Sequence, residues 1–255
     1  MNMIQLYQEA INKMVVAFNE MASQLGVPKR VFINGGYAYR YEKKTIYVAI
    51  FLKLARVVTG LQAIIQLNSA GLLQEQAVIH RVADELTEDI TFLTFSVIFA
   101  DATELHNKYL EAFFEEEIEG GKSAIESAQK RPMVPRKKIR SYINKDRGAG
   151  EDPGRGAEIS RTLSKTYSGY VHAAAPQIME LFSGDPPIVC LGAAHGSPLY
   201  QDHVDDMFNY FYRGLIAFSY GAKSFGNEGL FTFLFEYTKE FATKSGRAEY
   251  LVQKP

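Results

Sequence analysis

The sequence predicts an all-α protein, a single-domain bundle of six to seven helices over residues 1–255 with a short irregular or β-prone loop near 186–198. Two observations predict this fold. Apolar residues recur at three- and four-residue spacing along most of the chain, and glycine or proline separates the periodic stretches. Hydrophobic residues make up 47% of the 255 positions, which is enough to bury a sizeable core.

The N-terminal half predicts three helices. Residues 3–25 carry the first helical pattern, which Gly26 and Pro28 end. The stretch 31–41 places Asn34-Gly35-Gly36 between β-prone residues, and it fits either a small hairpin or an ordered loop. A second helix follows over 43–68. A third begins near Leu72, and the short connection between the two predicts antiparallel neighbours.

The third helix is expected to extend past Asp101 and to become acidic over 111–119. Residues 122–156 then form a basic, Gly-rich connection that we expect to be flexible. The next long helix is predicted over 157–183, where Pro186 and Pro187 follow it. A helical pattern resumes at Gln201, and an aromatic helix over 230–244 completes the bundle.

Charge and cysteine content exclude several classes of protein. The formal net charge is −1, so no global field attracts the chain to a polyanion. A single cysteine, Cys190, excludes an intrachain disulfide, and the first residues lack the pattern of a signal peptide. The apolar stretch 45–67 contains Lys53 and Arg56, which favours a core helix over a membrane span. We therefore expect a cytoplasmic protein with no membrane span.

The sharpest change in composition lies between an acidic and a basic segment. Residues 101–119 carry seven acids and one Lys, whereas 122–147 carry nine Lys or Arg and two acids. The basic stretch 130–147 has two interpretations. It forms a surface for nucleic acid, or it compensates the acidic helix before it, and the neutral total favours compensation.

Two polar helix faces are the candidates for a functional centre. In "TLSKTYSGYVHAAAPQIMEL" (162–181), Ser168 and His172 lie one turn apart, beside small residues that allow a second helix to approach. In the third helix, Arg81 and Glu85 lie one turn apart on the side opposite the apolar residues. Either both faces are solvated and carry surface ion pairs, or they meet in a cleft where Arg81 binds an anion, His172 transfers a proton and Glu85 orients one of them.

Other candidate sites are weaker. None of the five histidines follows a Glu by three positions, as a di-iron bundle requires, so we expect no metal and no cofactor. Cys190 lies in an apolar "IVCL" stretch, which is typical of a small buried residue rather than of a nucleophile paired with His195 or His203. The Gly-rich stretch 148–156 matches no phosphate-binding loop.

Two regions resemble a known family. "LKLARVVTGLQAIIQLNSAGLLQEQAVIHRVADELTEDITFL" (52–93) and "YSGYVHAAAPQIMELFSGDPP" (167–187) resemble segments of a widespread bacterial family of uncharacterised, all-helical proteins. The family's motif corresponds here to Arg56, Gly71, Glu75, Arg81 and Glu85 in the first segment. The resemblance implies a polar centre formed by Arg81, Glu85, Tyr167, Ser168 and His172.

A more distant likeness is to helical-bundle ribonucleases of the toxin and defence type. These use an Arg followed four to six residues later by a His, and this chain has no such pair. Two functions therefore stay open. The first is a binding, regulatory or interaction protein, either as a monomer or as a homo-oligomer. The second is a hydrolase or nuclease in which Arg56 and Arg81 bind phosphate and His172 acts with Glu85, Tyr167 and Ser168.

Overall fold

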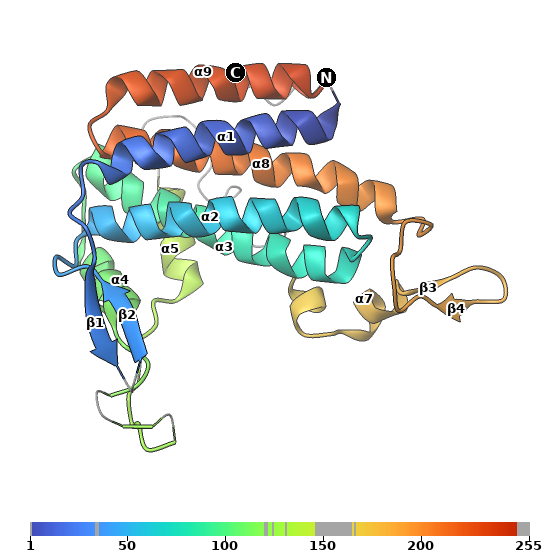
Figure 1. The fold of residues 1–255 in the computed structure, drawn as a ribbon, viewed down its shortest axis with the longest axis horizontal. Helices are drawn as coiled ribbons and strands as arrows, with labels where there is room; N and C mark the ends of the chain where they lie inside the picture. Colours follow the sequence, from blue (N-terminus) through green and yellow to red (C-terminus); the bar gives the residue numbers. More distant parts are fainter. Residues whose placement is uncertain are drawn as a thin grey trace.

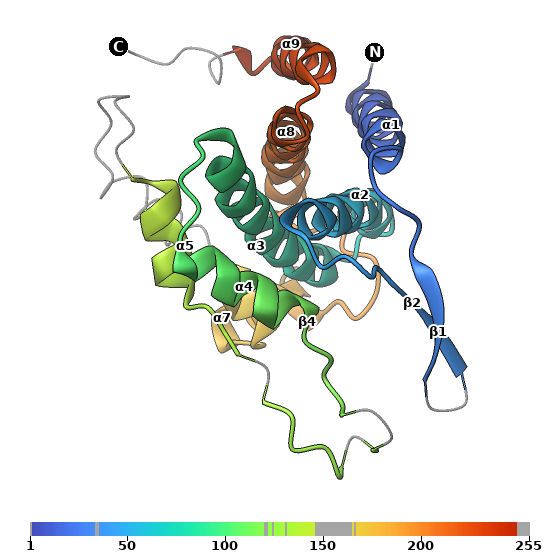
Figure 2. The same ribbon diagram turned by 90° about the vertical axis from the view of Figure 1, so that its left-hand side faces the viewer.

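The structure is a computed structural model that describes residues 2–33, 36–119, 122–123, 125–130, 132–145, 165 and 167–248. Long helices pack side by side in a bundle, which confirms the predicted all-α fold (Figures 1 and 2). These helices are α1 (Met3–Ala22), α2 (Ile46–Ser69), α3 (Leu73–Ile98), α8 (Tyr200–Ser224) and α9 (Glu228–Lys244). The three helices α2, α3 and α8 contact one another along their lengths and form the centre of the molecule.

Shorter elements lie at the two ends of the bundle (Figure 1). At one end, β1 (Lys29–Ile33) and β2 (Gly36–Arg40) form an antiparallel hairpin, which decides between the two interpretations of 31–41. Helices α4 (Glu104–Phe114) and α5 (Arg136–Ile143) lie nearby. At the other end are α7 (Ala175–Met179) and the short antiparallel pair of β3 (Phe182–Ser183) and β4 (Ile188–Val189). The β-prone loop predicted near 186–198 therefore contains β4.

Helix α8 approaches α2 closely because two of its contact positions are glycines. A Cβ atom at Gly214 would lie 2.9 Å from a methyl group of Leu61, and one at Gly221 would lie 2.8 Å from a methyl group of Leu54. The missing side chains leave room for the buried side chains of Leu61 and Leu54, with Met14 and Met21 of α1 beside them. The sequence thus sets the distance between the two central helices.

Helix α2 is long and apolar enough to cross a membrane by length and composition alone. In the structure, 61% of its most apolar window is buried inside the bundle. Its Lys53 is also buried, and the ammonium group pairs with the Asp89 carboxylate of α3 at 2.8 Å. Helix α2 is therefore a core helix, as its internal charges predict.

The third helix does not extend past Asp101, contrary to the prediction. It ends at Ile98, and Ala100 has a positive φ of 51° that reverses the direction of the chain. Thr103 then caps the first turn of α4, and the ring of His106 accepts a hydrogen bond from the Thr103 backbone N–H at 3.0 Å. The usual capping box has Glu or Gln three residues after the cap. Because His106 takes that role here, the sequence lacks the usual signal for the start of α4.

The predicted continuous helix over 157–183 is also wrong in its described part. Residues 167–171 are helical, and the segment before them lies largely outside the described residues. Ala173 then has a positive φ of 50°, and the short helix α7 starts afresh with Pro176 in its first turn. Because proline restricts the residue before it and lacks an N–H group, it favours a new helix start over continuation. This break changes which side chains face the bundle.

Candidate functional site

The polar side of α3 is buried rather than solvated. Asp84, Glu88 and Asp89 expose only 2%, 6% and 8% of their surface. Helix α8 covers Asp84, which accepts a hydrogen bond from the Arg213 guanidinium at 2.5 Å. A second bond from Arg213 reaches the Thr87 hydroxyl at 3.0 Å. An uncompensated carboxylate in this position would be costly, so Arg213 keeps α3 and α8 in register.

Helix α5 supplies the counter-ions for the other two carboxylates. Glu88 accepts hydrogen bonds from Arg136 at 2.5 Å and from Arg140 at 2.8 Å, and Arg136 also contacts Asp89. Burial raises the pKa of Asp89, but the charges of Lys53 and Arg136 outweigh it and hold that pKa below its usual value. The basic segment therefore compensates acidic residues, as favoured above. Lys122 pairs with Glu119 and Lys145 with Asp101, both in the acidic stretch 101–119, and Arg136 and Arg140 pair with acids of α3.

This contact also corrects the expectation that 122–156 is a flexible connection. Its described part contains α5, whose Ile139 is 1% exposed and whose two arginines are fixed to α3. The Gly-rich stretch 148–156 lies outside the described residues. Arg136 and Arg140 are part of the basic stretch 130–147, and both are used inside the protein.

A histidine between two tyrosines lies next along α3. The ring of His80 is fully buried and stacks on Tyr210 of α8, with ring centres 4.1 Å apart and an angle of 11° between the planes. Tyr167 meets the same imidazole edge-on at 5.4 Å, and its hydroxyl donates a hydrogen bond to Asp206. Burial, reinforced by the nearby His203, lowers the pKa of His80 to about 3. The imidazole is therefore neutral at neutral pH.

The segment around Tyr167 thus meets the Arg81 helix through one predicted residue, Tyr167, and not through Ser168 or His172. Tyr167 is 6% exposed and faces α3, whereas Ser168 is half-buried and His172 is exposed. His172 follows the last helical turn before the break at Ala173, so its side chain does not continue the predicted stripe. Within the described part of the chain, no hydrogen bond or ion pair joins Arg81 to His172.

The remaining predicted residues lie on α2 and α3. Arg81 is half-buried and forms an ion pair with Glu85 at 2.5 Å, one turn along its own helix. Its other terminal nitrogen, Nη1, lies 3.9 Å from the Asp84 carboxylate and has no hydrogen-bond partner within the described residues. Arg56 is exposed, and its guanidinium donates to the Thr59 hydroxyl at 3.2 Å. Glu75 is exposed and lines a cavity at the start of α3. The Arg81–Glu85 and Arg56–Thr59 pairs are local contacts of the kind that exposed helices form.

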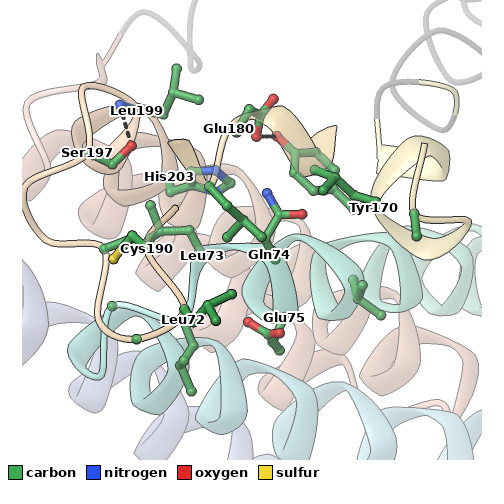
Figure 3. A pocket seen from close by; sticks show the side chains of 18 residues that line it. Leu72, Leu73, Gln74, Glu75, Tyr170, Glu180, Cys190, Ser197, Leu199 and His203 are labelled. Carbon is green, nitrogen blue, oxygen red and sulfur yellow. Dashed lines mark hydrogen bonds between the residues drawn. The ribbon is translucent and has the colours of Figure 1, made fainter. Parts of the chain in front are cut away.

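That cavity, of about 350 Å³, opens between the start of α3, the segment 170–181, the loop after β4 and the start of α8 (Figure 3). The loop is fixed to the turn between α2 and α3 by the Ala194 N–H, which donates to the Gly71 carbonyl at 2.9 Å. The ring of His195 also lies 3.0 Å from the Ser69 carbonyl oxygen. Aliphatic side chains form most of the walls of the cavity, namely Leu72, Leu73, Val78, Ile178, Leu181, Leu191 and Leu199.

Polar groups enter this cavity at a few defined places (Figure 3). The Tyr170 hydroxyl donates to the Glu180 carboxylate at 2.6 Å. His203 is 5% exposed, and its carbonyl accepts a hydrogen bond from the Gln76 side chain at 2.9 Å. Burial lowers the pKa of the His203 imidazole, although the charges of Asp206, Glu180 and Asp202 oppose this. A neutral imidazole therefore borders the cavity, and its Nδ1 has no hydrogen-bond partner within the described residues.

The charge of the lining is negative. Glu75 and Glu180 both line the cavity, and the described lining residues include no lysine or arginine. Cys190 also lines it and is partly exposed, contrary to the expectation of a buried residue. Its thiol lies 3.5 Å from the Ala193 carbonyl oxygen. Over the described ranges, no group of three or more His, Cys, Asp or Glu side chains is placed to hold a metal ion.

Sequence reasoning missed the residues that define this site, Tyr170, Glu180, His203, Asp206 and Tyr210. Of these five, only His203 enters the predictions from sequence, as a disfavoured partner for Cys190. One signal was present in the sequence. Gln76, His80 and Asp84 recur every four residues along α3 and form a narrow polar stripe on the helix. Such a stripe is compatible with burial when each of its residues has a hydrogen-bond partner.

Comparisons with known proteins add no relative. The chain matches no protein-family model, no curated protein and no solved structure. The resemblance to an all-helical bacterial family therefore stays a prediction.

Proposed function

We propose that this protein binds a small molecule in the cavity between α3, the segment 170–181 and α8, and that the ligand has an apolar body and a cationic group. One observation carries the proposal. The cavity is walled by leucines and two carboxylates, with no lysine or arginine among its described lining residues. A pocket of about 350 Å³ falls within the usual range of roughly 300–1,000 Å³ for small-molecule sites.

The polar groups suggest how the ligand is oriented. Glu180 is oriented by the Tyr170 hydroxyl, so its carboxylate is held in place before a ligand arrives. A ligand ammonium group that reaches Glu180 gains a charge-assisted hydrogen bond. The neutral imidazole of His203 offers a second polar contact at the same wall (Figure 3). The leucines bury the apolar body and supply most of the binding free energy.

This arrangement favours a binding or regulatory protein over a phosphate-directed hydrolase. A phosphate needs cationic partners, and Arg81 is paired with Glu85 while Arg56 lies exposed on α2. A proton-transferring His172 would have to be close to the bound phosphate, but its side chain is exposed beyond the break in the helix. The hydrolase alternative stays a prediction that the site geometry does not favour. The cytoplasmic location also stays a prediction, and its basis is the low cysteine content.

Isothermal titration calorimetry with matched probes tests the proposal. Phenethylamine, tryptamine and cyclohexylamine have an apolar body and an ammonium group, and 3-phenylpropionate has a similar body with a carboxylate. We expect the amines to bind and the acid not to bind. Replacing Glu180→Gln is expected to weaken amine binding about 10- to 100-fold, because a charged hydrogen bond contributes about 1.5–3 kcal/mol.

Glu236→Gln is the matched control, because Glu236 is an exposed carboxylate on α9 that does not line the cavity. It is expected to leave amine binding unchanged. Equal binding of the acid and the amines, equal losses in the two variants, or no amine binding at millimolar concentration would contradict the proposal.

A further inference from the structure

The hairpin of β1 and β2 carries a row of rings on one face. Its register pairs Arg30 with Tyr39 and Phe32 with Tyr37, so these four side chains share a face. Phe32, Tyr37 and Tyr39 expose 81%, 55% and 59% of their surface. The hairpin projects from the end of the bundle (Figures 1 and 2), which leaves this face open.

A planar cation joins these rings into one surface. The Arg30 guanidinium lies 3.8 Å from the centre of the Tyr37 ring and 5.3 Å from that of Phe32. Tyr37 and Tyr39 meet edge to face at 5.8 Å. Rings and a guanidinium plane therefore follow one another along the ribbon. Such a row offers stacking positions for flat aromatic ligands and a positive charge beside them.

Residues 29–44 carry more cations than acids although the whole chain does not. They contain five lysines and arginines and one acid, whereas the formal net charge of the chain is −1. Lys29 pairs with Glu42 at 2.6 Å, and Arg40 binds Glu116 at 2.5 Å, which fixes the base of the hairpin to the segment after α4. Arg30, Lys43 and Lys44 are the cations that remain to attract a polyanion.

The shape of the face favours a linear partner. Two strands of five residues cover a face of about 17 Å by 10 Å. The area of this face is far below the roughly 800 Å² that each partner buries in a stable protein–protein interface. The exposed rings lie along the two strands, so an extended chain can contact them one after another.

We propose that the face formed by Arg30, Phe32, Tyr37 and Tyr39 binds single-stranded nucleic acid. About three bases stack on the three rings, and the cations of residues 29–44 attract the phosphates. The surface is distinct from the basic stretch 130–147, in which Arg136 and Arg140 bind carboxylates of α3. It also lies at the opposite end of helix α2 from the cavity (Figure 1), and that helix of 24 residues is about 36 Å long.

Fluorescence anisotropy with labelled dT12 and rU12 in 50 mM salt tests this proposal. We expect both oligonucleotides to bind at micromolar protein and an unlabelled duplex to compete poorly. Phe32→Ala and Tyr37→Ala are each expected to weaken binding about tenfold, whereas Tyr37→Phe keeps the ring and is expected to bind like the parent protein. Affinity is expected to fall as salt rises, because bound counterions are released.

Phe233→Ala is the matched control. Phe233 is an exposed ring on α9, and the Lys13 ammonium lies 5.3 Å from its centre, so the variant removes a similar ring with a similar cation. It is expected to leave the anisotropy unchanged. Because the hairpin rings are exposed, circular dichroism and the melting temperature are expected to stay the same in every variant.

Three results would overturn the proposal. The first is the absence of oligonucleotide binding at 50 mM salt. The second is an equal loss of binding in Phe233→Ala and Phe32→Ala. The third is sedimentation of the parent protein, but not of Phe32→Ala, with vesicles of 70% phosphatidylcholine and 30% phosphatidylserine while dT12 fails to bind, which would assign the face to a membrane.

Discussion

Gly71 occupies a position where alanine is disfavoured for two separate reasons. Its φ is +70°, a conformation that costs an L-residue about 1–2 kcal/mol. A Cβ atom there would also lie 2.8 Å from the backbone nitrogen of Ala194 and 3.0 Å from the Cα atom of Ala193. Both neighbours are backbone atoms, so the loop after β4 would have to move away from the turn between α2 and α3.

The expected cost of Gly71→Ala combines these terms. Moving the loop lengthens the hydrogen bond from the Ala194 N–H to the Gly71 carbonyl, now 2.9 Å, and losing it costs about 1 kcal/mol. With the backbone term, the variant is expected to be destabilised by about 2–3 kcal/mol. For a protein of this size, that lowers the melting temperature by roughly 5–10 °C in differential scanning calorimetry.

Gly226→Ala separates the two reasons. Gly226 has a φ of +73° and nothing within 4 Å of a built Cβ atom, so it has the conformational cost without the steric one. It is expected to lose about half as much stability, and to leave amine binding in the cavity unchanged. If Gly71→Ala is no less stable than Gly226→Ala, the loop does not depend on this contact and our account of the cavity wall is wrong.

Two further predictions concern the buried polar groups of α3. Arg213→Met removes the guanidinium that is hydrogen-bonded to the 2%-exposed Asp84 and leaves only Arg81, at 3.9 Å, as a cationic neighbour. The variant is expected to cost about 3 kcal/mol in urea unfolding, and adding Asp84→Asn is expected to restore part of the loss. Full stability of the single variant would contradict this. His80 has a folded-state pKa of about 3, below its unfolded value of 6.5, so its neutral form stabilises the protein above pH 6.5 and that stability is lost as the pH falls toward 3. His80→Phe keeps a ring against Tyr210. Its melting temperature is expected to fall less between pH 7 and pH 4.5 than that of the parent protein. Equal falls in the two proteins would show that His80 is not responsible for the loss of stability at low pH.

The sequence predicted the bundle because the long helices have strong local signals. Apolar spacing and the glycine and proline stops located α1, α2, α8 and α9 to within a few residues. The charges inside α2 correctly distinguished a core helix from a membrane span. Where the prediction failed, at Ala100 and Ala173, the chain adopts a positive φ at an alanine, for which a single sequence offers no signal.

The candidate site was predicted less well because burial of the polar residues depends on tertiary contacts. The sequence placed the segment around Tyr167 beside α3, and the structure brings Tyr167 against His80. It could not show that Arg213, Arg136 and Arg140 come from distant segments to neutralise the acids of α3. From the sequence alone, a solvated polar face and a face buried in a cleft therefore stay equally compatible with the pattern. The break after His172 leaves that histidine exposed, and the histidine that borders the cavity is His203.

The attachment of α5 to α3 limits how the surrounding chain can vary. The carboxylates of Glu88 and Asp89 are paired inside the molecule by two guanidinium groups one helical turn apart on α5, and Asp89 also by Lys53 of α2. Insertions or deletions over 115–135 are tolerable as long as α5 presents the same helical face to α3. A change of length that turns α5 by one residue removes the guanidinium groups from both carboxylates and leaves Glu88 without a counter-ion. Sequence drift in this region should therefore alter segment length freely while keeping the Arg-x-x-x-Arg spacing fixed.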